Sequence, residues 1–325
     1  MATSALRVVS AEGRVLATVM DATYEIWHEG LSREAYRRWY DAQIATPWGR
    51  ARLRRFALAD GADVLASAKE YAFDASIDGR RIRVLGLGAV FTQPQARGRG
   101  HARELIDRLL ARAAADGVDY ALLFSEIGAD YYRHLHFEAV PTRQHVLRVA
   151  ESPRGAPAVL VRAGEEHDLP ALEEMGRTRS AAYRFHLERD ADLIQYAIAK
   201  KRLLAGLGLP GARQVLFFAA EEGRSAVAYV VITAKGTDWV LEECGDRDPA
   251  GARIGALLQA LIARQPADIR PTIRGRLPAG FLPPQVTIVE SRPTADVMMI
   301  RPLAGAPISP ALGEADVLYW QSDVF

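Results

Sequence analysis

The sequence predicts a mixed α/β protein made of two consecutive domains, each with a mixed antiparallel and parallel sheet flanked by helices. Its 325 residues correspond to about two domains at roughly 150 residues per domain. Each half contains short apolar strands separated by turns, then an amphipathic helix, then another strand. Residues 151–157 between the halves have the Pro, Gly and Ser composition of a linker. We therefore expect a boundary near residues 152–158.

The first half predicts an antiparallel meander followed by one parallel strand. Strands are expected at residues 6–10, 55–59, 64–72, 82–91 and 120–124. Residues 14–54 have apolar and aromatic side chains at a period near 3.6, which predicts two helices. Residues 100–115 predict an amphipathic helix with Gly117 as its cap. A strand, a helix and a strand in close succession favour a right-handed parallel crossover.

The second half repeats this order of elements, in pattern and not in letters. Strands are expected at residues 159–162, 214–220, 226–233, 238–243, 286–289 and 297–301. Helices are expected from residue 165, through about Leu204, and over residues 251–264. We therefore predict domains at residues 1–152 and 159–303, with a tail at residues 304–325 that ends in aromatic side chains and is expected to dock.

The composition excludes several classes of protein. Hydrophobic residues make up 49% and charged residues 25%, as in an ordinary globular chain with packed cores. Since 41 Lys and Arg balance 40 Asp and Glu, the net charge of +1 provides no overall field to attract nucleic acid or an anionic membrane. The single Cys244 excludes an internal disulfide framework. With no signal pattern at the start and no long apolar run, we expect a cytoplasmic protein.

The most specific local feature is a glycine loop between the strand that ends at Phe91 and the following helix. The loop consists of Gln95, Ala96, Arg97, Gly98, Arg99, Gly100, His101 and Ala102. Two glycines separated by one residue allow a tight turn with outward N–H groups, and the helix start adds its own unpaired N–H groups. This arrangement predicts a cradle for an anion such as a pyrophosphate, with Arg97, Arg99 and Arg103 adding charge at its rim.

Two better-known glycine loops do not fit this motif. A phosphate-binding loop of the Walker type requires Lys after the last glycine, where this sequence has His101. A dinucleotide fingerprint requires a third small residue at the position of Arg103. The remaining alternative is an ordinary strand-to-helix turn that uses glycine for its geometry alone.

The loop resembles the acyl-CoA loop of the GNAT superfamily of N-acetyltransferases, Gln/Arg-x-x-Gly-x-Gly/Ala, at Gln95, Gly98 and Gly100. Residues 130–138 resemble a second signature of that family, aromatic-Tyr-x-x-x-Gly-Phe, with Tyr132 as the Tyr and His136 where Gly is usual. Residues 123–128 are similar to a subgroup that includes fungal lysine acetyltransferases. The resemblance covers about residues 5–148, whereas residues 159–303 share only the order of elements.

The resemblance implies a GNAT fold, acetyl-CoA as cofactor and one cofactor site per chain. By this resemblance, the acyl end of acetyl-CoA is expected at Ala89, Val90, Phe91 and Ser125. Backbone N–H groups of the fourth strand are expected to bind the thioester carbonyl. The corresponding loop of the second half, residues 248–253, keeps one of the three defined positions, so this half is expected to be a degenerate copy. Two such domains in one chain resemble the tandem-GNAT acetyltransferases, which include an aminoglycoside-modifying group.

By the same resemblance, Tyr132 is the general acid that protonates the leaving thiolate, and the alternative for Tyr132 is a half-buried helix aromatic. The base is left open between Glu70 and Glu126, each of which also fits a surface carboxylate. The carboxylate of Phe325 is a third candidate, because some tandem enzymes bring their chain end into the first domain's cleft. Four aromatic residues are expected either to line an acceptor pocket or to pack in the core: Trp27, Trp39, Tyr40 and Trp48. Glu242 and Glu243 are expected at a domain interface or in solvent.

The predicted function is therefore N-acetylation of a small amine or amino acid by acetyl-CoA, with no nucleic acid or membrane as partner. A protein lysine is the alternative acceptor. A non-catalytic acyl-CoA sensor and an acyl-CoA enzyme of other chemistry, an O-acyltransferase or a decarboxylase, are the alternative functions. The pair His134 and His136 lies at a spacing that points the rings apart on a helix, so no metal site is expected.

Overall fold

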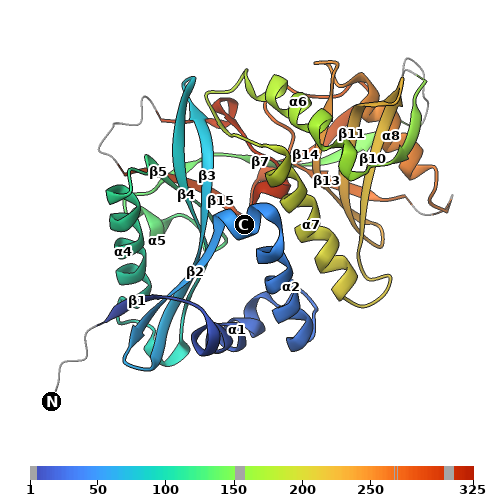
Figure 1. The fold of residues 1–325 in the computed structure, drawn as a ribbon. Helices are drawn as coiled ribbons and strands as arrows, with labels where there is room; N and C mark the ends of the chain where they lie inside the picture. The colour runs from blue at the N-terminus through green and yellow to red at the C-terminus, as the bar shows by residue number, and fades with distance from the viewer. Residues whose placement is uncertain (1–5, 151–157, 267, 269, 304–310) are drawn as a thin grey trace.

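The computed structural model describes residues 6–150, 158–266, 268, 270–303 and 311–325. They form two mixed sheets flanked by helices, so the predicted mixed α/β class is confirmed (Figure 1). The predicted linker at residues 151–157 and the first part of the tail, residues 304–310, lie outside the described residues.

The first sheet has the strand order β1-β2-β3-β4-β5-β15-β6. Its strands are β1 (Arg7–Ser10), β2 (Leu53–Asp60), β3 (Asp63–Ile77), β4 (Arg80–Thr92), β5 (Tyr120–Ser125), β15 (Val297–Pro302) and β6 (Glu138–Val140). Strands β1 to β4 pair antiparallel, and β4 pairs parallel with β5, which confirms the predicted meander and crossover. The crossover helix is α4 (His101–Ala115). At the edge of β3, β9 (Phe185–Leu187) pairs with β16 (Val317–Leu318).

The second sheet repeats the pattern in the order β14-β7-β13-β12-β11-β10-β8. Its strands are β14 (Val286–Pro293), β7 (Arg143–Val149), β13 (Thr272–Gly275), β12 (Asp238–Asp246), β11 (Ser225–Lys235), β10 (Gln214–Glu222) and β8 (Leu160–Ala163). Here β12 pairs parallel with β13, and α8 (Ala252–Ile262) connects them as α4 connects β4 to β5.

The two halves exchange a strand. Each sheet contains one strand from the other half of the chain. β15 lies between β5 and β6 in the first sheet, and β7 lies between β13 and β14 in the second. The exchanged β15 is deeply buried, because Met298, Met299 and Ile300 are each at most 1% exposed. The predicted ranges 1–152 and 159–303 assign both strands to the wrong sheet. The sequence expectation also missed the strands β6, β7, β9, β13 and β16.

Helices cover both faces of the first sheet. On one face α4 packs the side chains of Leu105, Ile106 and Leu109 against β3 and β4. The other face carries α1 (Gly13–Trp27), α2 (Arg33–Ala45) and α3 (Pro47–Arg52). Residues 14–54 thus form three helices instead of two, because Thr46 caps a new helix through the N–H of Gly49 and Pro47 follows at its first position.

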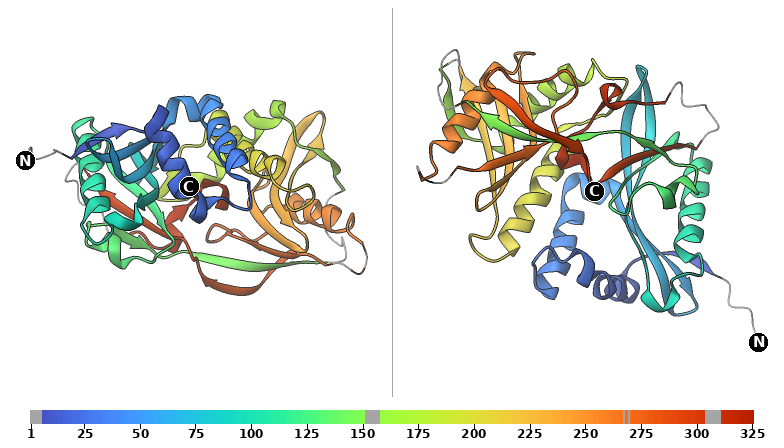
Figure 2. Two further views of the ribbon diagram at one scale, coloured as in Figure 1. Left: turned by 90° about the horizontal axis from the view of Figure 1, so that it is seen from below. Right: turned by 180° about the vertical axis from the view of Figure 1, so that it is seen from behind.

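The second half packs directly against the helices of the first half. Its helix α7 (Ala191–Leu207) contacts α2 and α3, and it packs beside α6 (Leu169–Ser180) on the second sheet, where α7 contacts β10 and α6 contacts β11 and β12 (Figure 2). The chain end lies at this junction, where Arg189 makes ion pairs with Glu243 at 2.5 Å and with Asp323 at 3.0 Å. Among the described residues, no helix is long and apolar enough to cross a bilayer.

Candidate active site

Strands β4 and β5 separate halfway along their length. Their parallel pairing runs from Val84 with Tyr120 to Leu87 with Leu123 and then stops. Just beyond this point β4 has a bulge, since Ala89 and Val90 stand opposite the single residue Ala68 of β3. Ala89 has a φ of 46°, a left-handed conformation that non-glycine residues rarely adopt. The bulge thus lies just past the point where β4 and β5 cease to pair.

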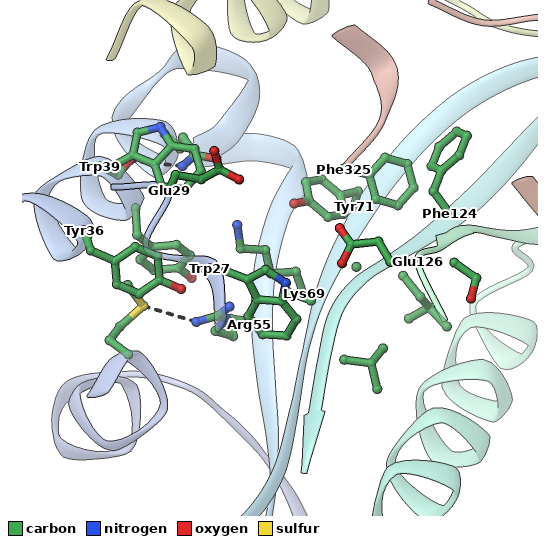
Figure 3. Close-up of a pocket in the computed structure, with 18 of the residues that line it drawn as sticks. Trp27, Glu29, Tyr36, Trp39, Arg55, Lys69, Tyr71, Phe124, Glu126 and Phe325 are labelled. Carbon is green, nitrogen blue, oxygen red and sulfur yellow. Dashed lines mark hydrogen bonds between the residues drawn. The ribbon is translucent and has the colours of Figure 1, made fainter. Parts of the chain in front are cut away.

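A cavity of about 230 Å³ lies at this divergence. One wall consists of side chains from α1, α2 and the loop between them, and the opposite wall consists of the β4 bulge, the end of β5 and the chain end (Figure 3). Its lining residues from the first wall and from β2 and β3 are Met20, Trp27, Glu29, Tyr36, Trp39, Tyr40, Gln43, Arg55, Lys69 and Tyr71. Those from the second wall are Leu87, Gly88, Ala89, Val90, Phe124, Ser125, Glu126, Ile127, Tyr132 and Phe325.

The predicted glycine loop lies outside the cavity, at the start of α4. Gly98 and Gly100 have φ values of 74° and 79°, and Gly100 is the N-cap of α4. A Cβ atom at either glycine meets no other atom within 4 Å, so the backbone here is open on its outer side. Gln95, Arg97 and Arg99 are exposed, whereas Ala96 is buried and His101 and Ala102 are half-buried and anchor the turn. Since the first N–H groups of a helix have no intrahelical partner, the start of α4 has N–H groups available to an acceptor from outside the helix.

Tyr132 belongs to the one-turn helix α5 (Asp130–Arg133) and is 8% exposed. Burial, then the neighbouring Tyr131 and Glu126, raises the pKa of its phenol to about 12, so the hydroxyl keeps its proton through the neutral range. His136 takes a φ of 60° after this helix, which is the conformation that Gly provides most easily. The structure therefore brings Tyr132 to the cavity as predicted.

Glu126 follows the end of β5, and Figure 3 shows its carboxylate pointing into the cavity. Partial burial, then the charges of Asp296 and Glu29, raises the pKa of this carboxyl above its ordinary value. Ser125 beside it donates a hydrogen bond to the carbonyl of Gly128 at 2.5 Å, which fixes the chain where β5 ends.

Glu70 does not reach the cavity. Successive residues of a strand point to opposite faces, and Glu70 lies between Lys69 and Tyr71, which both line the cavity. Its carboxylate instead forms an ion pair with Arg112 of α4 on the other face. The prediction of Glu70 as a candidate base is therefore wrong, and its side chain joins the sheet to α4.

Two predicted aromatic residues lie beside the cavity and not in its lining. Phe91 remains in the β3–β4 ladder opposite Ser67, and its ring packs 6.4 Å from that of Trp27. Trp48 belongs to the core of the first sheet, where its ring lies 4.7 Å from that of Tyr196. Trp27, Trp39 and Tyr40 do line the cavity.

Phe325 lines the cavity from the chain end, in line with the expected docking of the tail. Its ring packs 4.5 Å from Tyr71 and 5.3 Å from Phe124. It lies directly over β4, since a Cβ atom at Gly88 would be 3.2 Å from the carbonyl oxygen of Phe325. Lys200 of α7 donates to the carbonyl of Val324 at 2.9 Å and so holds this end in place.

Two cations of the cavity, Arg55 and Lys69, were missed by the sequence expectation. They are directly opposite each other on β2 and β3. The available signal was their alternation with the buried apolar residues Leu53, Ala57 and Tyr71 on the same face.

The corresponding loop of the second half is closed. Gly251 is the N-cap of α8 with a φ of 72°, like Gly100, but a Cβ atom there would lie 2.8 Å from the ring of Phe281. Arg179 stacks on that ring with its Cζ 3.7 Å from the centroid. A side chain thus occupies the space that is open beside Gly98 and Gly100.

Glu242 and Glu243 are buried, at 2% and 0% exposure, and not in solvent. Glu242 lies 3.0 Å from Lys201 of α7, and Glu243 accepts a hydrogen bond from Ser322 of the chain end. Both therefore join the second sheet to elements at the junction of the halves. Among the described residues, no group of three or more His, Cys, Asp or Glu side chains is placed to hold a metal ion.

Comparisons with known proteins identify a matching domain family and similar folds. Residues 14–140 match a domain family described as "Acetyltransferase (GNAT) domain". A search of curated proteins found no match. Among solved structures, the chain is similar to a GCN5-related N-acetyltransferase from Kribbella flavida, with 21% identity, 93% of this chain and 72% of that chain covered and a TM-score of 0.68.

Two further solved structures share the fold at lower identity. One is Eis1 from Mycobacterium abscessus, with 16% identity, 92% of this chain and 74% of that chain covered and a TM-score of 0.57. The other is the N-myristoyltransferase of Saccharomyces cerevisiae with bound myristoyl-CoA, with 10% identity, 92% and 82% covered and a TM-score of 0.56.

Proposed function

Residues 14–140 form a GNAT acetyltransferase domain, and from this premise we propose that the chain moves an acetyl group from acetyl-CoA to the amine of a small molecule or amino acid. One observation carries the proposal. β4 leads from its bulge at Ala89 and Val90 into the open glycine loop at the start of α4, and the buried Tyr132 lines the same cavity as the bulge.

The residues along this path fit an acyl-CoA. The loop from Arg97 to Ala102 offers N–H groups and a helix N-terminus to a pyrophosphate, and neither glycine carries a Cβ that would block it. The bulge residues Ala89 and Val90, with Ser125 across the gap, would hold the acyl end. Acetyl-CoA supplies a thioester carbonyl that an amine can attack. The similar yeast structure holds myristoyl-CoA, which supports an acyl-CoA as the donor class.

Tyr132 is the proposed general acid. Its hydroxyl is protonated at neutral pH, because burial raises its pKa to about 12. This phenol is a weaker acid than the leaving thiol, whose pKa is near 8.5, so its hydroxyl acts first as a hydrogen-bond donor to the sulfur as negative charge develops there. N–H groups of the bulge would stabilise the oxygen of the attacked carbonyl.

Glu126 is the proposed general base. Its carboxylate points into the cavity and accepts the proton of the acceptor ammonium, directly or through a water molecule. The alternative base is the α-carboxylate that Phe325 carries when it is the last residue, because its carbonyl lies against Gly88 of the same strand as the bulge. A variant with one glycine added after Phe325 moves that carboxylate and leaves Glu126 in place. If this variant loses activity and Glu126→Gln does not, the base is the carboxylate of Phe325.

The second half is proposed to shape the site without binding a cofactor of its own. Phe281 covers Gly251, and the chain end is held over the cavity by residues of α7 and β12. We therefore expect one acyl-CoA per chain.

The test combines binding and turnover in the full chain. Isothermal titration with CoA should give one site per chain, and release of free thiol from acetyl-CoA should accelerate with at least one amine of a broad panel. Binding of CoA without thiol release for any amine would favour a non-catalytic acyl-CoA sensor, and absence of CoA binding would reject the proposal.

A further inference from the structure

Arg55 and Lys69 line the cavity, and no carboxylate among the described residues pairs with either of them. We infer that these two cations bind an anionic group of the acceptor, so that the acceptor is an amine that also carries a carboxylate or a phosphate. The inference rests on the proposed function, because it names the substrate class of the same site.

The two cations form a row with the β4 bulge. Arg55 of β2 is the partner of Lys69 of β3, and Lys69 is the partner of Gly88 of β4. All three line the cavity, so both side chains extend from the same face of the sheet. Adjacent strands lie about 4.8 Å apart, which places Lys69 one strand and Arg55 two strands away from the proposed acyl site.

Arg55 has the strongest need for a partner. The residue is 3% exposed, and its buried Nε has no hydrogen-bond partner. Its Nη1 donates to the thioether of Met20 at 3.1 Å, which is a weak acceptor, and its Cζ lies 5.2 Å from the ring centroid of Tyr40. A buried guanidinium without an anion is costly, so an oxygen acceptor that enters here gains unusually strong hydrogen bonds.

Among the described residues, the ammonium group of Lys69 faces the rings of Trp39 and Tyr40. Its Nζ lies 5.9 Å from the ring centroid of Trp39 and 5.5 Å from that of Tyr40. Burial, then the charges of Arg55 and Lys200, lowers the pKa of its amine well below the ordinary value. An anion bound beside both side chains would oppose this effect and favour the charged form of Lys69.

The two side-chain carboxylates that line the cavity lie away from this pair. Glu29 at the rim makes an ion pair with Arg213 at 3.0 Å, and Glu126 stands at the end of β5 on the opposite wall. An acceptor can thus direct its amine toward Glu126 and its anionic group toward Arg55. A polycationic acceptor would bring positive charge against both cations.

The test compares amines in matched pairs that differ in one anionic group. Free α-amino acids are compared with their amides, and phosphoethanolamine with ethanolamine, by thiol release from acetyl-CoA. We expect kcat/KM to favour the anionic member of at least one pair by tenfold or more, and the preferred pair identifies the anion as carboxylate or phosphate. Arg55→Gln should raise KM for that member about 10- to 100-fold and leave KM for its neutral partner unchanged.

Lys69→Gln is a second variant with the same expectation, in case Arg55→Gln does not fold. Arg54→Gln is the matched control: it removes the same charge from the next residue of β2, whose exposed side chain lies on the other face. If neutral amines are turned over as well as their anionic partners, the inference is overturned while the proposed function stands.

A binding measurement separates failure of the inference from failure of the proposed function. N-acetylated amino acids and N-acetylphosphoethanolamine are titrated into the CoA-bound protein beside their neutral counterparts. If no amine releases thiol, the proposed function fails, and tighter binding of the anionic probes that disappears in Arg55→Gln still supports the anion site. Equal binding of anionic and neutral probes overturns it.

Discussion

The ring of Phe325 lies against the ring of Tyr71, with 4.5 Å between their centroids. Tyr71 belongs to β3 in the first half, and Phe325 is the last residue of the sequence. Segments that are far apart in the sequence therefore line one cavity. The contact is close because Gly86 and Gly88 of β4 have no side chains beneath the Phe325 ring. The position of the tail therefore depends on β4.

Gly86→Ala tests this dependence. A Cβ atom at residue 86 would lie 2.7 Å from Cζ of Phe325 and from Cε2 of Phe73, so both rings must move. We expect a loss of about 1–3 kcal/mol in the free energy of unfolding, measured with urea, and a lower kcat. The control Gly176→Ala lies inside α6 with no atom within 4 Å of the new Cβ, and it should raise stability by about 0.5–1 kcal/mol. Equal stability of the two variants would contradict the contact.

Tyr132→Phe removes the proposed acid and keeps the ring that packs beside Phe137. Without the hydroxyl, kcat for thiol release should fall by about 10²-fold or more, because proton donation to the leaving sulfur is lost. The affinity for CoA, measured by titration, should not change. Tyr131→Phe is the matched control, since Tyr131 is 38% exposed and does not line the cavity. An unaltered rate in Tyr132→Phe would remove the phenol from the mechanism.

Glu126→Gln is expected to change the pH dependence of kcat/KM. The base acts when deprotonated, so activity in the unmodified chain should fall as the pH drops through the pKa of Glu126. Partial burial raises that pKa, and the fall should therefore begin above the ordinary range of a glutamate. In the variant, the fall in kcat/KM at low pH should disappear, and most of the activity should be lost. On the alkaline side Tyr132 should cause no fall below about pH 11, because its pKa is about 12. A limb that persists in the variant would assign the base elsewhere.

Gly98→Asp places a side chain and a negative charge on the open side of the glycine loop. It should weaken binding of CoA by at least about tenfold, from charge repulsion and from the strain of a φ of 74°. Gly223→Asp makes the same change in the β10–β11 turn, where φ is 55° and the space around the Cβ is equally open. Titration of CoA should find that control unchanged. Undiminished affinity in Gly98→Asp would show that the pyrophosphate binds elsewhere.

The sequence was sufficient for features that depend on local chemistry. Apolar alternation and turns located the strands of the meander, and the glycines of the loop gave the start of α4 to within one residue. Tyr132, Glu126 and the bulge residues Ala89 and Val90 were predicted and do line the cavity.

Features that depend on contacts between distant segments were not predicted. The exchange of β7 and β15 is invisible to local patterns, because each strand is short and its partners lie far away in sequence. Glu70 and Lys69 are neighbours that point to opposite faces, and only the register of β3 decides which of them reaches the cavity. The absence of a carboxylate partner for Arg55 among the described residues likewise could not be predicted, because it depends on all the segments that pack around this side chain.

The crossing of β7 and β15 between the sheets has a consequence for biosynthesis. As the chain leaves the ribosome, the sheet that carries the glycine loop lacks the strand between β5 and β6 until residue 302 has emerged. Until then, the flanks of β5 and β6 expose unpaired backbone groups, a condition that favours association between nascent chains. A truncated product that stops in the second half would therefore lack the strand that completes the first sheet.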